Sequence, residues 1–153
     1  ESVVEENGKS YTLENFAVGS LTFSGEVTEE NEQELLKQLV EDFAGQFEQG
    51  FPNFEVQKQG RMRFGKYRGY GMDFTSLVQR KGEEDVEVFG RVILLPPAVT
   101  QQENGATIIM LATSHADGID SLADLGVKGE LPSIIESFEI GPTAPKAKKK
   151  SKR

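Results

Sequence analysis

The chain has 153 residues, with 17 Lys and Arg against 25 Asp and Glu, for a formal charge of −8. This length fits one domain that buries a core without covalent cross-links. No run of about 18 apolar residues occurs, which excludes a membrane-spanning helix within this chain. The absence of Cys excludes disulfides, thiolate metal sites and Cys nucleophiles.

The charge is divided unevenly along the chain. No acid follows Glu139, and the last eight residues contain six cations, namely Lys146, Lys148, Lys149, Lys150, Lys152 and Arg153. The remainder has 11 basic residues against 25 acidic ones, a formal charge of −14 that repels nucleic acid at long range. We therefore predict a loose segment over 1–15, one acidic domain over 16–141, and a disordered basic tail over 142–153.

The first half of the chain predicts a strand and then a long helix. Apolar residues at period two predict a first strand over 16–23. Thr28 followed by two acids is typical of a helix N-terminus. Six apolar residues then recur at helical spacing and predict an amphipathic helix over 29–48, ended by Gly50 and Pro52: Leu35, Leu36, Leu39, Val40, Phe43 and Phe47.

The second half predicts an antiparallel meander and a short final helix. The apolar period changes to two after Pro52, and turn signals at Gly65-Lys66 and 81–85 separate the strands. Asn104-Gly105 is a hairpin signal. Strands are predicted near 54–64, 70–78, 86–95 and 106–113, the last of them apolar on both faces and therefore covered on both.

A helical turn over 121–125 and a helix over 131–138, with Pro132 in its first turn, complete the predicted elements. This order predicts an α+β fold. In it, a twisted antiparallel sheet is covered by the long helix of the N-terminal half and by the C-terminal helix.

His115, the single histidine, lies beside Ser114 and close to Asp117 and Asp120. These residue types suit either a nucleophilic triad or a polar loop, but no G-x-S-x-G elbow accompanies them. One His excludes HExxH zinc sites, and the acids up to Asp124 lack the spacing of a calcium loop. We predict no catalytic, cofactor-binding or metal-binding residue. An enzyme that uses this loop remains the third alternative.

A cluster of basic and aromatic residues is the candidate binding site: Arg61, Arg63, Lys66, Tyr67, Arg68 and Tyr70. Arg68-Gly69-Tyr70-Gly71 opens like the RNP1 strand of RNA-recognition domains, where arginines and aromatic rings contact phosphates and bases. Asp73 and Thr75, however, stand where that motif has Val and an aromatic residue. In the structural alternative, Gly69 and Gly71 let a helix pack closely or mark a bulge, and the arginines balance an acidic neighbouring strand.

The later part of the chain resembles the closing elements of Mog1/PsbP-like domains. An antiparallel meander leads to the apolar segment Ala106–Ala112, and Ile134-Ile135-Glu136-Ser137-Phe138 matches the Ile-x-x-Ser-Phe ending of the family's last helix. The resemblance spans about 20–140. It implies a non-enzymatic accessory or binding domain, in a family with photosystem, Ran-binding and bacterial lipoprotein members. It carries over no functional residue.

Two functions from different classes follow. The first is a non-enzymatic domain that binds a protein partner or supports a larger assembly, without a cofactor. The second is an RNA- or polyanion-binding module that uses the 61–70 cluster and the tail residues Lys148, Lys149 and Lys150. The chain begins with Glu1 rather than Met, which leaves room upstream for a signal peptide or an anchor and favours an exported or membrane-anchored bacterial domain.

Overall fold

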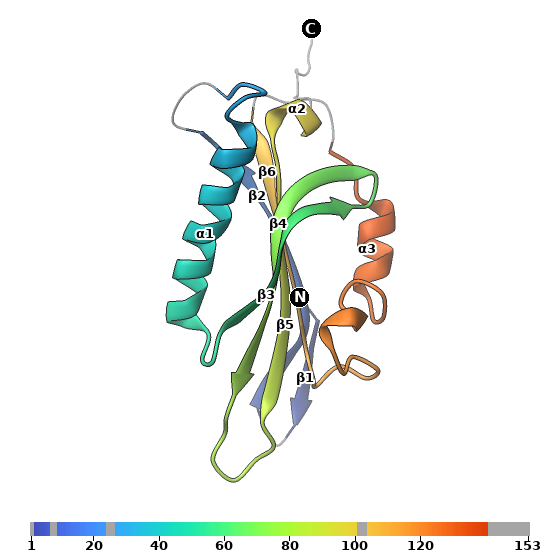
Figure 1. Ribbon diagram of the computed structural model, residues 1–153. Helices are drawn as coiled ribbons and strands as arrows, with labels where there is room; N and C mark the ends of the chain where they lie inside the picture. The colour runs from blue at the N-terminus through green and yellow to red at the C-terminus, as the bar shows by residue number, and fades with distance from the viewer. Residues whose placement is uncertain (1, 7–8, 24–26, 101–103, 141–153) are drawn as a thin grey trace, which may run out of the picture.

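The computed structural model describes residues 2–6, 9–23, 27–100 and 104–140. Six strands form one antiparallel sheet in the order β1-β2-β6-β5-β4-β3 (Figure 1). The strands are β1 (Ser2–Glu6), β2 (Lys9–Leu21), β3 (Glu55–Phe64), β4 (Tyr67–Val78), β5 (Val86–Leu95) and β6 (Gly105–Thr113). The helices are α1 (Glu32–Gly50), α2 (Pro97–Thr100) and α3 (Leu131–Ser137), with a 3-10 turn at Leu122–Asp124. The predicted α+β class and antiparallel sheet are confirmed.

The N-terminal strands correct the prediction of a loose segment over 1–15. Ser2–Glu6 and Lys9–Leu21 pair with each other, and β2 also pairs with β6 from Glu14 opposite Ala112 to Leu21 opposite Gly105. Backbone pairing between β1 and β2, and of Glu14 and Asn15 with β6, places this polar segment in the sheet although it has few apolar side chains. The predicted tail over 142–153 lies outside the described residues.

Helix α1 begins at Glu32, three residues after the predicted start. The predicted N-terminal residue Thr28 nevertheless takes part in the hydrogen bonds that precede the helix. The Asn31 side chain accepts a hydrogen bond from the Thr28 amide at 2.7 Å, and the Thr28 hydroxyl accepts one from the Asn31 amide at 3.3 Å. These reciprocal bonds satisfy donors that no earlier turn of helix would serve.

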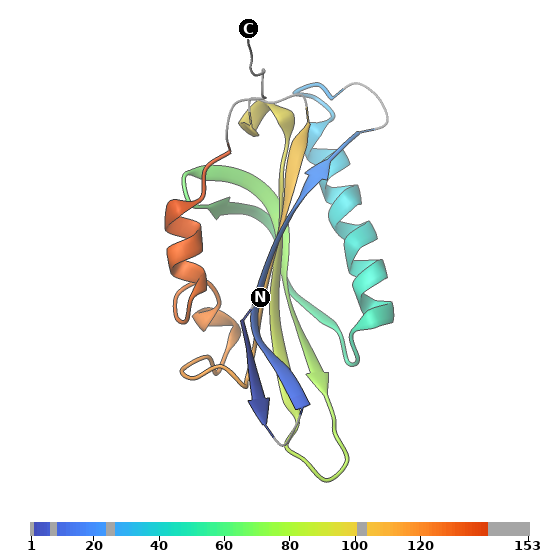
Figure 2. The ribbon, with the colours of Figure 1, turned by 180° about the vertical axis from the view of Figure 1, so that it is seen from behind.

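The two long faces of the sheet carry separate apolar clusters. On the α1 side, Leu36 and Val40 share a cluster with Met72 and Phe74 of β4. On the α3 side, Leu131 joins a cluster built on β5 and β6. Figures 1 and 2 show α1 and α3 on opposite sides of the sheet. Strand β6 lies between the clusters and is buried along most of its length, as its two apolar faces predicted.

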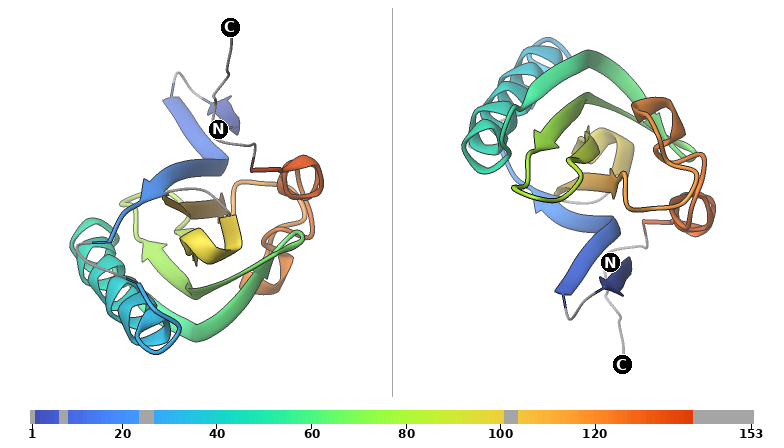
Figure 3. Two further views of the ribbon diagram at one scale, coloured as in Figure 1. Left: turned by 90° about the horizontal axis from the view of Figure 1, so that it is seen from above. Right: turned by 90° about the horizontal axis from the view of Figure 1, so that it is seen from below.

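The β3–β4 hairpin curls around the end of the sheet (Figure 3). Gly60 opposes Gly71 in the ladder and has a φ of 150°, which favours glycine, while a Cβ on Gly71 would overlap the Val92 carbonyl. The bend carries Phe64 to the far side, where its ring lies 4.9 Å from that of Phe138. Gly69 and Gly71 therefore lie against the backbone of β5, and the predicted close packing of a helix on these glycines is wrong.

The predicted hairpin at Asn104-Gly105 is wrong, whereas the final helix lies close to its predicted range. Asn104-Gly105 does not make a two-residue hairpin, because residues 96–104 and helix α2 connect β5 to β6 and Gly105 already lies in β6. Helix α3, predicted over 131–138, ends at Ser137, and the Phe138 amide donates a hydrogen bond to the Ile135 carbonyl at 3.4 Å. Within the described part of the chain, no helix combines the length and apolar character needed to cross a bilayer.

Candidate functional site

Four residues of the predicted cluster lie on one face of the β3–β4 hairpin. Arg61 opposes Tyr70, and Arg63 opposes Arg68, in the antiparallel register. Because side chains alternate along a strand and opposed residues share a face, all four point to the α1 side. The three arginines are exposed, and Tyr70 is half-buried against the cluster under α1.

These side chains form one wall of a pocket of about 420 Å³, which we call the arginine pocket. Its other walls are the first turns of α1 and the segment around α2, which contribute Glu32, Gln33, Leu36, Pro96 and Val99. The sequence did not identify these walls. Only the packing of α1 and of α2 against the sheet brings them to the hairpin, and no local pattern signals such a contact.

The arginine pocket concentrates positive charge. Among the described residues, no carboxylate oxygen lies within 4.0 Å of Arg61, Arg63 or Arg68, whereas Arg80 and Arg91 pair with Glu83 and Asp73. Arg63 and Arg68 also face each other across the ladder, an arrangement that is unfavourable for like charges. The alternative in which these arginines balance an acidic neighbouring strand is therefore wrong. The one acid of β4, Asp73, bonds Arg91 instead.

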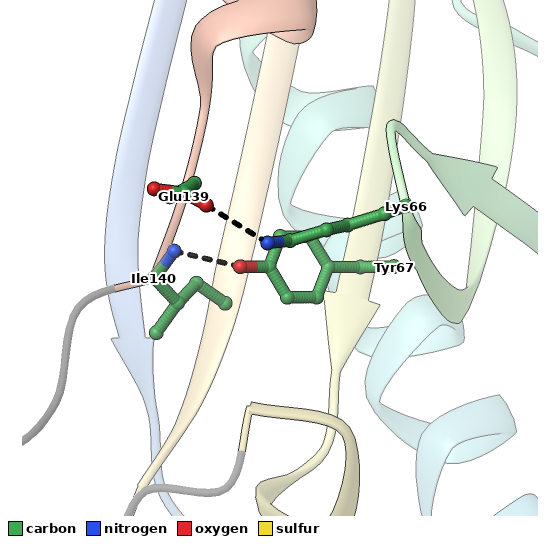
Figure 4. A network of polar contacts seen from close by, with 4 residues as sticks. All are labelled: Lys66, Tyr67, Glu139 and Ile140. Atoms are coloured by element: carbon green, nitrogen blue, oxygen red, sulfur yellow. Dashed lines mark hydrogen bonds and ion pairs between the residues drawn. The ribbon is translucent and has the colours of Figure 1, made fainter.

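Lys66 and Tyr67 belong to the hairpin tip and contact the segment after α3. The Tyr67 hydroxyl oxygen accepts a hydrogen bond from the Ile140 amide at 2.8 Å, and Lys66 Nζ lies 3.0 Å from Glu139 Oε1 (Figure 4). The hydrogen bond to Glu139, together with its negative charge, raises the pKa of Lys66. The predicted cluster thus divides into a pocket group and a tip group.

The aromatic rings do not gather on the arginine face. Phe64 is buried in the cluster on the α3 side, and Tyr67 packs against the same cluster. Of the three rings in the predicted cluster, Tyr70 alone lies on the face of the arginines, and it packs against the cluster under α1. Stacking of successive bases needs several rings on one surface. The described hairpin residues do not assemble such a surface.

The polar groups around His115 hold the loop that follows β6. The Ser114 hydroxyl oxygen accepts a hydrogen bond from the Glu87 amide at 3.0 Å. The Asp124 carboxylate accepts one from the Asp120 amide at 2.9 Å, which holds the pKa of Asp124 below its usual range. No group of three metal-ligand side chains occurs in the described ranges. The candidate tail residues Lys148, Lys149 and Lys150 lie outside those ranges.

Comparison with known proteins identifies no family. No family profile matches the chain, and no curated protein is similar to it at a significant level. Among solved structures, the chain aligns with a crystal structure of a protein of unknown function from Pseudomonas aeruginosa, at 13% identity and a TM-score of 0.38. The alignment covers 93% of this chain and 98% of the other. A similarity at this level carries no argument about fold or function.

Proposed function

We propose that this protein is a non-enzymatic binding domain that takes an acidic segment of a protein partner into the arginine pocket. The observation that carries the proposal is the set of three arginines around one pocket, with no described carboxylate within ion-pair distance. Guanidinium groups bind carboxylates through paired, charge-assisted hydrogen bonds. A partner carboxylate would also relieve the repulsion between Arg63 and Arg68.

The pocket suits a polypeptide better than a nucleic acid. Leu36, Pro96 and Val99 line it beside the arginines, so acidic and aliphatic side chains of one peptide both have complementary walls. RNA would find the guanidinium groups but no set of rings on which bases stack. RNA or another polyanion bound by the 61–70 cluster remains the alternative function, and the test below includes it.

The fold and the predicted resemblance are consistent with this role. Mog1/PsbP-like domains, which the sequence resembles, are accessory and binding domains rather than enzymes. We further propose that α1 and α3 act as covers on the two faces of the sheet. In that arrangement α1 gives the arginine pocket a rigid wall, since its Leu36 and Val40 are buried on the sheet. A rigid wall lowers the entropic cost of binding a flexible segment.

The test compares a short peptide in which Glu alternates with Leu against a single-stranded RNA of equal charge, by fluorescence anisotropy. Arg63→Ala and Arg68→Ala should each weaken peptide binding by ~10-fold to ~100-fold, because a hydrogen bond to a charged group contributes ~1.5–3 kcal/mol. Lys58→Ala is the matched control. It removes a cation from β3 on the opposite face of the hairpin, where Lys58 opposes Asp73.

If Lys58→Ala weakened peptide binding as much as the arginine variants, binding would depend only on net charge, and the arginine pocket would not be the binding site. Binding of RNA without binding of the peptide, lost with the same arginines, would establish the alternative function instead.

A further inference from the structure

Strand β3 forms one edge of the sheet (Figure 1). It pairs with β4 along one side, and in the described part of the chain no strand pairs with its other side. The backbone amides and carbonyls that point to that side are therefore open to a further strand. Residues 55–59 of β3 are exposed, as are Arg61 and Arg63. The edge is thus accessible as well as unpaired.

Side chains of two kinds alternate along the second half of this edge. Gln59, Arg61 and Arg63 point to the α1 side, where Gln59 bonds the Tyr70 hydroxyl and the two arginines line the arginine pocket. Met62 points to the other side and is only partly buried against the cluster there. An added strand places its own side chains beside those of β3, on the same two faces. It therefore meets two guanidinium groups with one set of alternate residues and a methionine with the other set.

The charge of the edge selects the strand that pairs with it. A segment in which Glu alternates with an aliphatic residue places carboxylates beside Arg61 and Arg63 and apolar side chains beside Met62. The β3 strand of a second copy does not fit, because antiparallel pairing about Met62 sets Arg61 of one copy against Arg63 of the other. The register with β4 also shifts between Val56 and Lys58, and irregularities of this kind limit unselective pairing at sheet edges.

We propose that the acidic segment of the protein partner binds as an additional strand of the sheet, paired with the free edge of β3. This inference rests on the proposed function of the arginine pocket and specifies the bound segment as extended, with carboxylates on alternate residues. Backbone hydrogen bonds to β3 contribute affinity, and the arginines select carboxylates on one face of the segment. The edge and the arginine pocket are used together, because Arg61 and Arg63 belong to both.

The experiment compares the labelled Glu-Leu peptide with two forms of it that carry methyl groups on backbone nitrogens, in one form on the Glu residues and in the other on the Leu residues. In a strand the amides of successive residues point to opposite edges, so all Glu amides face one edge and all Leu amides face the other. Only one of these sets donates to β3. By fluorescence anisotropy with the full chain, one methylated peptide should bind about tenfold or more weakly, and the other within about threefold of the unmodified peptide.

Equal binding of the two methylated peptides, whether both weak or both tight, would overturn the inference. If Arg63→Ala still weakened binding of the unmodified peptide in that case, the proposed function of the arginine pocket would stand. Failure of the unmodified peptide to bind would overturn the proposed function and the inference together. Sedimentation velocity tests the other occupant of the edge. If the free chain is a dimer and the peptide binds only as that dimer dissociates, the edge belongs to a second copy, and the inference is overturned.

Discussion

Phe74 joins the end of α1 to the centre of the sheet. Its ring is fully buried, and ring centroids lie 5.4 Å away in Phe47, 5.6 Å in Phe51 and 5.0 Å in Phe54. On the next strand it opposes Gly90, where a Cβ would overlap the ring. The sheet therefore accommodates this ring because Gly90 has no side chain, and the two positions are predicted to be energetically coupled.

The expected magnitudes follow from burial and overlap. Phe74→Ala should cost about 3–5 kcal/mol, the usual range for removing a fully buried aromatic ring. Gly90→Ala should cost about 1–3 kcal/mol, since the added methyl displaces a ring that three others enclose. In the double variant the methyl enters space that the ring has left. Its cost should therefore fall short of the sum by about 1–3 kcal/mol.

Urea unfolding followed by far-UV circular dichroism measures these free energies, since the chain has no Trp to report by fluorescence. Phe43→Ala is the matched control. Phe43 lies on α1 in the same apolar cluster but is only half-buried, so its loss should cost less than that of Phe74. Strict additivity of Phe74→Ala and Gly90→Ala would refute the packing argument, as would a cost for Phe43→Ala that equals the cost for Phe74→Ala.

Two further predictions concern the α3 side. The buried Glu14 carboxylate accepts hydrogen bonds from the Glu130 amide at 3.0 Å and the Leu131 amide at 3.3 Å, so Glu14→Ala should cost about 1–3 kcal/mol in the same urea assay. Because the folded pKa of Asp124 is lowered, its contribution to stability is present above the unfolded pKa and is lost as pH falls through the folded pKa. NMR titration should place its inflection below the usual Asp range, and Asp124→Asn should reduce the acid-side loss of stability.

Side-chain periodicity predicted the helices and strands that bury an apolar face. Helix α1 and strands β4, β5 and β6 bury regular faces, so their patterns are visible in the sequence. Strand β2 broke the pattern at Glu14, which faces the core although it is charged. Glu14 is buried because its carboxylate accepts hydrogen bonds from the amides at the start of α3, which lie 116 and 117 residues later in the chain. Periodicity alone does not reveal such a partner.

The candidate site was predictable only as far as strand alternation reaches. Alternation and the Gly65-Lys66 turn are enough to bring Arg61, Arg63, Arg68 and Tyr70 to one face. They do not predict α2, a four-residue helix that begins at Pro97 and contributes Val99 to the pocket wall. They also cannot show that the hairpin tip meets residues 139 and 140, which are 73 positions away.

The last prediction separates the two roles considered for Tyr67. In the RNP1-like reading its ring stacks on a base, and Tyr67→Phe keeps the ring and so keeps that function. In the structure the hydroxyl oxygen accepts the Ile140 hydrogen bond, which Tyr67→Phe removes while leaving the packing of the ring against Phe138. Loss of one such bond costs about 0.5–1.5 kcal/mol, so hydrogen exchange at the Ile140 amide should become roughly 2-fold to 13-fold faster if exchange proceeds through local opening. The Phe138 amide, which is bonded to Ile135, serves as the internal reference. Equal acceleration at both amides would indicate general loosening of the α3 segment, and no acceleration at Ile140 would refute the role assigned to the hydroxyl.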